Sequence, residues 1–107
     1  AGWCPPCRAE MPSIERLSKE MDGKNFKIVA VNVGQSKKEV ADFIEKHKYT
    51  FPIYLDERGT VSAAFASRGI PITYVINKEG KIIAVRPGAM EYDQPELIKA
   101  FKDLADE

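Results

Sequence analysis

Apolar residues recur at helical spacing in three stretches of the chain. In each stretch they stand three or four positions apart with charged residues between them, which is typical of a helix with one buried face. Two stretches open on a capping-box pattern, in which a short polar residue is followed three positions later by glutamate. The sequence therefore predicts helices over residues 4–21, after Ser36 with Glu39, and from about Asp93 with Glu96.

Four shorter stretches are rich in β-branched and apolar residues and predict strands. The longest, residues 26–33, is largely apolar throughout, as expected of a strand that is covered on both faces. The last two stretches are separated by Asn77-Lys78-Glu79-Gly80, which indicates a hairpin turn. Helices and strands alternate, so the sequence predicts a layered α/β domain. The expected strands are residues 26–33, 53–55, 72–76 and 81–86.

Length and charge narrow the class of protein. The 107 residues suit one domain. The 16 basic and 16 acidic side chains balance to a formal net charge of zero, whereas nucleic-acid-binding domains usually concentrate an excess of Lys and Arg. No apolar run approaches the roughly 20 residues that a membrane-spanning helix needs. We therefore expect neither nucleic-acid binding nor a membrane span within these residues.

Two cysteines stand three positions apart in the string WCPPC of residues 3–7. A disulfide across so short a span contributes only about 2 kcal/mol in the loop-entropy model, against about 4.7 kcal/mol for a loop of about 100 residues. The spacing suits redox chemistry better, because Cys4 would precede the first helical turn, where free N–H groups and the helix dipole favour a thiolate. Pro5 and Pro6 lose no helical hydrogen bond there. They also stiffen the short ring that a Cys4–Cys7 disulfide would close, and so tune it.

The pair therefore predicts a redox-active disulfide in which Cys4 attacks and Cys7 resolves the mixed disulfide. Two other interpretations are half of a zinc site, shared with a second copy, and an inert pair. A structural zinc ion needs four ligands, and besides the two cysteines the chain offers one histidine, His47, on a distant predicted helix. We expect no metal site, and we interpret Met11 and Met90 as packing residues.

Two motifs resemble the thioredoxin superfamily, and within it the TlpA/ResA-like branch. The first is AGWCPPCRAEMP at residues 1–12, and the second is RGIPITYVINKEGKI at residues 68–82. Residues 34–55 are similar to the insertion that separates this branch from plain thioredoxin, so the resemblance covers essentially the whole chain. The matching positions are Trp3, Cys4, Pro6, Cys7, Glu10, Pro12, Ile70, Pro71 and Gly88.

The resemblance implies a thioredoxin-like three-layer α/β sandwich with a mixed sheet and a central insertion. Family members have a hairpin and a first core strand before the cysteine motif, and residues 1–107 contain neither. Without that interior strand two rows of backbone groups would lack partners, each at a cost of about 1–3 kcal/mol when buried. We therefore expect one domain that is incomplete at its N-terminus, with the strand supplied by an upstream segment or by another chain.

The resemblance also implies roles for residues around the cysteines. Pro71 would follow a cis peptide bond beside the disulfide, leaving the backbone of Ile70 free to pair with an extended substrate segment; an ordinary trans proline is the alternative. Glu10 would be partly buried, with a raised pKa, and would exchange protons with the thiols; a solvated helix glutamate is the alternative. Trp3 would pack beside the site and shield Cys4, or else be a structural core residue.

The function that the resemblance implies is a protein thiol–disulfide oxidoreductase with no cofactor beyond the Cys4–Cys7 disulfide. Its expected setting is a bacterial extracytoplasmic compartment, reached by a membrane tether outside these residues. Its expected partners are client proteins, such as apocytochrome c, and an upstream electron donor. The alternatives are a cytoplasmic thioredoxin-like reductase, a non-catalytic binding module with this fold, and a metallochaperone.

Overall fold

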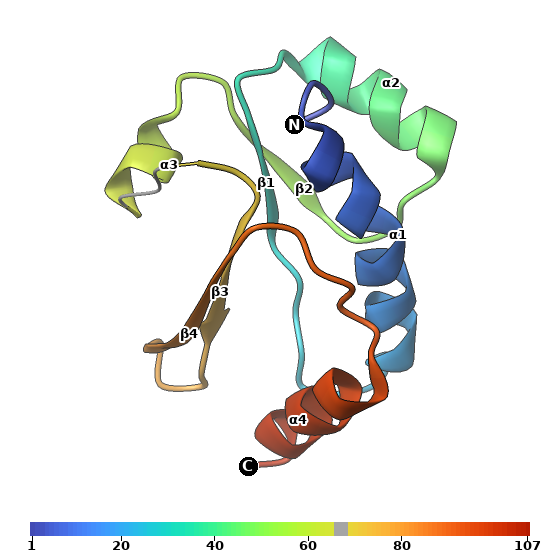
Figure 1. The fold of residues 1–107 in the computed structure, drawn as a ribbon, viewed down its shortest axis with the longest axis vertical. Coiled ribbons are helices and arrows are strands. Elements are labelled where there is room, and N and C mark those ends of the chain that lie inside the picture. The colour runs from blue at the N-terminus through green and yellow to red at the C-terminus, as the bar shows by residue number, and fades with distance from the viewer. Residues whose placement is uncertain (66–68) are drawn as a thin grey trace.

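The computed structural model describes residues 1–65 and 69–107, in which helices and strands alternate (Figure 1). The cysteine helix runs along one side of the molecule, and the C-terminal helix lies at the opposite end from the N-terminus. Among the described residues, no helix is both long and apolar enough to cross a bilayer. The elements are α1 (Pro5–Glu20), β1 (Ala30–Val33), α2 (Lys37–His47), β2 (Ile53–Asp56), α3 (Thr60–Ala64), β3 (Ile72–Ile76), β4 (Ile82–Pro87) and α4 (Pro95–Ala105).

Helix α1 begins where the sequence predicts. Cys4 is its N-cap residue with extended backbone angles, and Pro5 and Pro6 occupy the first two helical positions. Proline suits these positions because their N–H groups would have no acceptor within the helix. At the other end Met21 is the C-cap, and its N–H donates to Leu17 O at 3.0 Å. The predicted helix over residues 4–21 is confirmed to within one residue.

The first strand is shorter than predicted. β1 covers only Ala30–Val33, which pairs in parallel with Ile53–Asp56 of β2. Residues 26–29 have no strand partner among the described residues, and Phe26 instead packs its ring on Phe101 of α4. The prediction of a strand over 26–33 was therefore wrong in its first half, because a pairing partner and not β-branched composition decides where a strand extends.

Of the two predicted capping boxes, the structure contains one. At α2, Ser36 Oγ accepts from Glu39 N–H and Glu39 accepts from Ser36 N–H, as predicted. At α4, Gln94 is the N-cap and makes no side-chain capping bond, so the prediction of an Asp93–Glu96 box was wrong. The carboxylate of Asp93 instead accepts from Arg16 Nε at 2.6 Å. An ion pair to α1 has replaced the local cap.

The strands form two separate two-stranded sheets among the described residues. β1 and β2 are parallel, whereas β3 and β4 form the predicted antiparallel hairpin with Thr73 opposite Arg86. A closed four-stranded sheet would have contradicted the expectation of an absent core strand, and these residues form none. That an upstream segment or another chain supplies a core strand between β1 and β3 stays a prediction.

The core lies where α1, α4 and the segment before α4 meet. Its buried members include Leu17 of α1, Met21 at the C-cap of that helix, and Tyr92 from the loop after β4. Half-buried apolar side chains from both helices and from the loop after α1 surround them. The remaining members are Ala105, which is buried, and Ile14, Phe26, Met90, Ile98 and Phe101, which are partly buried.

Truncating the core at α1 should lower stability sharply. Leu17 is 3% exposed, and removing a buried leucine side chain to alanine costs about 2–5 kcal/mol. We expect Leu17→Ala to lower the free energy of unfolding by that amount in urea titrations. Leu55→Ala is the matched control, because Leu55 is 39% exposed; an equal loss at both positions would contradict this description of the core.

Candidate redox site

The sulfur atoms of Cys4 and Cys7 are joined in a disulfide at the start of α1. Their Cα atoms lie 5.3 Å apart. The N–H of Cys7 points at Cys4 Sγ, with a distance of 3.3 Å between the nitrogen and the sulfur. This N–H belongs to the first helical turn, which has no helical acceptor for it. When the disulfide is reduced, the same N–H and the helix dipole favour a thiolate at Cys4.

Both sulfur-bearing residues are nearly covered. Cys4 is 5% exposed and Cys7 is 8% exposed, whereas the neighbouring Trp3 is 59% exposed. The alternative of a core tryptophan at Trp3 was therefore wrong. Trp3 offers a broad aromatic surface directly before the disulfide, which is the kind of side chain that protein interfaces favour.

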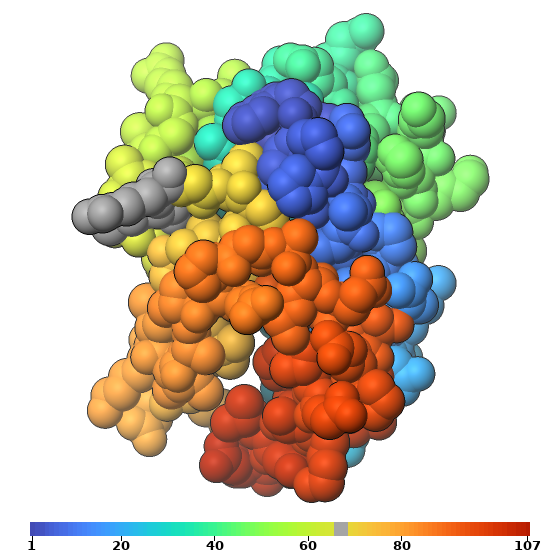
Figure 2. All heavy atoms as spheres, viewed as in Figure 1, coloured from blue at the N-terminus to red at the C-terminus, as the bar shows by residue number. Residues whose placement is uncertain are grey.

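The second motif lies against the first. Ile70 O is 4.0 Å from Cys4 Sγ, although 66 positions separate the two residues in the chain. The Ile70–Pro71 peptide bond is cis, as the resemblance implied. Figure 2 shows the yellow segment around residue 70 in contact with the blue N-terminal residues. The tertiary structure thus brings together the cysteines and the proline that the sequence singled out.

An open groove starts beside this contact. It has a volume of about 600 Å³ and runs along Ile70 and Pro71 towards the β3–β4 hairpin. Its lining is mainly apolar, which suits an extended peptide better than a charged ligand. The lining residues are Gly69, Ile70, Pro71, Ile72, Tyr74, Val85, Pro87 and Gly88.

Glu10 is buried one turn after Cys7. It is 7% exposed, and its Oε2 accepts from the N–H of Met90 at 3.2 Å. Burial raises the pKa of Glu10, and the hydrogen bond from Met90 N–H only partly opposes that rise. The alternative of a solvated glutamate was therefore wrong. A buried carboxyl group with a raised pKa holds its proton to higher pH than an exposed glutamate does.

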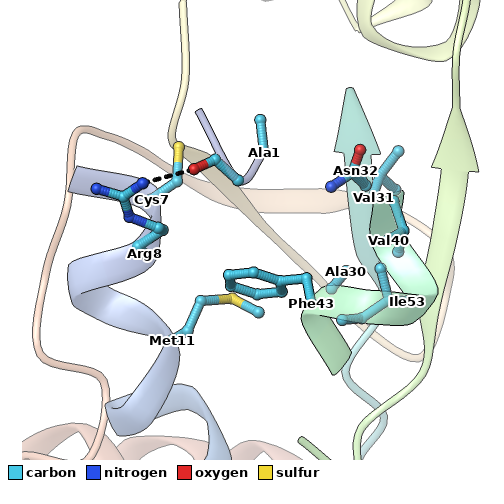
Figure 3. A pocket seen from close by; sticks show the side chains of 11 residues that line it. Ala1, Cys7, Arg8, Met11, Ala30, Val31, Asn32, Val40, Phe43 and Ile53 are labelled. Carbon is cyan, nitrogen blue, oxygen red and sulfur yellow. Dashed lines mark hydrogen bonds between the residues drawn. The ribbon is translucent and has the colours of Figure 1, made fainter. Parts of the chain in front are cut away.

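A small cavity lies behind the disulfide, between α1, β1 and α2 (Figure 3). Its volume is about 50 Å³, and the side chains of Met11 and Phe43 point towards each other across it. Asn32 lies at its edge and donates from Nδ2 to Gln35 Oε1 at 2.9 Å. Cys7 is therefore backed by a narrow and largely apolar space.

His47 is not part of this site. It is exposed at the end of α2 and stacks on Tyr49, with 5.6 Å between ring centroids. In residues 1–65 and 69–107, no group of three or more His, Cys, Asp or Glu side chains is arranged to hold a metal ion.

Sequence reasoning missed the residues that hold Glu10 in place. Ser13 is fully buried, and its Oγ accepts from Tyr92 N–H at 2.9 Å. Met90 was interpreted only as a packing side chain, but its backbone N–H is the donor to Glu10. A serine close to the apolar stripe of a predicted helix was the one signal available, since a buried hydroxyl group needs a partner.

Comparison with known proteins agrees with this arrangement. A sequence model described as the AhpC/TSA family matches residues 1–85. The chain is 38% identical over 101 residues to the thiol-disulfide oxidoreductase ResA of Bacillus subtilis, covering 91% of this chain and 56% of that protein. The chain therefore spans little more than half the length of this curated relative.

Solved structures show the same fold. StoA from Bacillus subtilis superposes with a TM-score of 0.77 at 30% identity, covering 95% of this chain and 74% of that one. The exposed lipoprotein thioredoxin of Streptococcus pneumoniae has a TM-score of 0.77 at 27% identity, covering 94% and 78%. The predicted thioredoxin-like fold and the resemblance to the ResA-like branch are confirmed.

The raised pKa of Glu10 makes the stability of the oxidised protein depend on pH. In the unfolded chain Glu10 loses its proton near its ordinary value of 4.5, whereas the folded protein retains it to higher pH. Stability should therefore fall as pH rises from about 4.5 through the raised pKa of the folded state. We expect Glu10→Gln, which keeps an acceptor for Met90, to remove that fall in urea titrations carried out at a series of pH values from 4.5 upwards.

Glu39→Gln is the control of opposite sign. Hydrogen bonds from Ser36 lower the pKa of Glu39, so its stabilising effect is present above its ordinary value and is lost as pH falls. If Glu10→Gln and wild type showed the same dependence on pH, the burial cost assigned to Glu10 would be refuted.

Proposed function

Because the chain belongs to the AhpC/TSA family, we propose that it is a thiol–disulfide oxidoreductase that acts on proteins through Cys4 and Cys7. The observation that carries the proposal is the disulfide at the start of α1, with the Cys7 N–H directed at Cys4 Sγ and Ile70 O at 4.0 Å from that sulfur. The names of its relatives support the same class.

The reaction is a two-step thiol–disulfide exchange. In the reduced protein, the Cys4 thiolate attacks one sulfur of a client disulfide, which forms a mixed disulfide and releases one client thiolate. Cys7 then loses its proton and attacks Cys4 Sγ, so that the Cys4–Cys7 disulfide forms and the second client thiolate leaves. Two electrons pass to the client, whose thiolates take up two protons. A dithiol donor must then reduce the protein again.

The groove beside Ile70 and Pro71 is the proposed docking place for the client. Because the disulfide is nearly covered, a client sulfur must approach along a defined path, and Ile70 O lies at the end of the groove nearest Cys4. An extended client segment would pair with the backbone of Ile70 and place its apolar side chains in the groove. Trp3 supplies an exposed aromatic contact next to it.

Glu10 is the proposed proton partner of the thiols. Its burial raises the pKa of its carboxyl group, so that it would accept a proton as Cys7 ionises and return it later. The reaction would require no cofactor other than the disulfide itself.

We further propose an extracytoplasmic setting and a reductant role. The support is likeness to a ResA thiol-disulfide oxidoreductase and to an exposed lipoprotein thioredoxin. The clients would be proteins with reducible cysteine pairs, apocytochrome c among them, and an upstream dithiol protein would supply the electrons. Reduction of apocytochrome c disulfide by the purified protein tests this finer proposal.

Single cysteine variants test the order of attack. In Cys7→Ser, Cys4 is still able to attack a client disulfide but no second thiol releases it, so this variant should accumulate a mixed disulfide with a client such as insulin whose disulfides are intact. Cys4→Ser should trap none. Both variants should lower turnover in insulin reduction to the uncatalysed rate, measured by turbidity.

Wild-type protein and the double serine variant are the controls for trapping. If Cys4→Ser trapped client as well as Cys7→Ser, the assignment of Cys4 as the attacking residue would be wrong. If all variants matched wild-type turnover, the proposed function would fail.

Alkylation of the reduced protein tests the thiolate. The helix start should lower the pKa of Cys4 below the ordinary value of about 8.5. We expect Cys4 to react fastest with iodoacetamide, with a pH midpoint clearly below that value, and Cys7 to react slowly. Two ordinary thiols with midpoints near 8.5 would favour a non-catalytic binding module instead.

A further inference from the structure

Residues 88–92, between β4 and α4, contact both α1, which carries the cysteines, and the segment around Pro71. We call these two parts the halves of the site, and residues 88–92 the bridging segment. It begins at the cis-proline: the N–H of Gly88 donates to Pro71 O at 2.9 Å. Gly88 has φ +84°, a left-handed conformation that residues with a side chain adopt only at a cost. The chain therefore turns sharply from β4 towards α1 while staying attached to Pro71.

The middle of the bridging segment contacts α1 at Glu10. The N–H of Met90 donates to Glu10 Oε2 at 3.2 Å. Among residues 1–65 and 69–107 it is the donor to this carboxylate, so the position of Met90 affects how far the carboxylate is stabilised there. Burial, and in addition the nearby charge of Glu10, raises the pKa of the Tyr92 phenol.

The end of the bridging segment is held by Ser13 of α1. Ser13 Oγ accepts from Tyr92 N–H at 2.9 Å and donates to Glu10 O at 2.8 Å. Because Ser13 is fully buried, water does not compete for either bond. The backbone of Tyr92 is thus fixed to the helix that carries the cysteines.

The side chain of Tyr92 reaches the opposite half of the site. Its hydroxyl group donates to Thr73 Oγ1 at 2.8 Å, and Thr73 lies on β3 two residues after Pro71. Tyr92 is only 6% exposed, and its ring belongs to the core cluster with Leu17 and Met21. One residue therefore connects α1, through its N–H, with the strand that follows the cis-proline, through its hydroxyl group.

We infer that Tyr92 is a positioning residue of the redox site, which through Ser13 and Thr73 holds the Met90 N–H against Glu10 and holds the Pro71 strand against Cys4. The inference rests on the proposed function for its meaning, since positioning matters only if the cysteines exchange. Burial raises the pKa of Tyr92, against the hydrogen bond to Thr73 and the nearby charge of Arg86, so the phenol remains neutral and able to donate at neutral pH.

Tyr92→Phe tests the inference in the full chain, because it keeps the buried ring and removes only the bond to Thr73. We expect the equilibrium constant for oxidation of the cysteine pair against dithiothreitol to change threefold or more. We also expect the pH midpoint of Cys4 alkylation to move. Neither measurement needs a client, so both remain readable if the proposed activity on proteins fails.

Two further variants make the result specific. Thr73→Val is nearly isosteric and removes the same bond from the other side, so it should reproduce the Tyr92→Phe changes, and the double variant should add nothing further. The matched control is Tyr54→Phe, because Tyr54 is exposed on β2; it should leave both measurements at their wild-type values. If Tyr92→Phe does not yield folded protein, Thr73→Val alone decides the test.

The inference is overturned by a purely structural outcome, in which Tyr92→Phe or Thr73→Val lowers the free energy of unfolding but leaves the exchange equilibrium and the alkylation profile unchanged. A different pattern identifies failure of the proposed function. In that case wild-type protein does not reduce insulin, even though the variants shift the equilibrium and the alkylation profile as expected.

Discussion

The first turn of a helix has backbone N–H groups without helical acceptors, and in this protein a sulfur atom receives one of them. The N–H of Cys7 points at Cys4 Sγ across the short ring. Through that contact and the helix dipole, the start of α1 favours negative charge on Cys4 Sγ. It depends on α1 starting at Pro5 and no earlier, which the two prolines and the extended N-cap together ensure.

Helix α1 has to be held rigidly for this contact to be useful, and the core and the loop after β4 contribute to that. Leu17 and Met21 anchor its far end in the core. Near the cysteines, Ser13 and Glu10 bind the backbone of the loop after β4. The same loop binds Pro71 through Gly88. Buried polar groups cost free energy unless they are paired, so these bonds both satisfy the site and restrict its geometry.

Local chemistry explains which elements were predictable. The start of α1, the Ser36–Glu39 cap and the β3–β4 hairpin depend on neighbouring residues, and each was predicted to within about a residue. The first strand and the start of α4 were mispredicted because their outcome depends on distant partners. β1 extends only as far as β2 pairs with it. Asp93 binds Arg16 of α1 and is therefore not available as a cap.

The sequence by itself determined the chemistry of the first motif: two cysteines at helix-start spacing with two prolines between them. These features are readable because each acts over three or four residues. The motif around Pro71 was identified by its resemblance to the thioredoxin superfamily and not by a local pattern. Only the tertiary structure decided that Ile70 meets Cys4 across 66 positions, that Glu10 is buried, and that Ser13, Tyr92 and Thr73 join the two halves. Burial and long-range hydrogen bonds arise from packing of distant segments, and no local pattern encodes them.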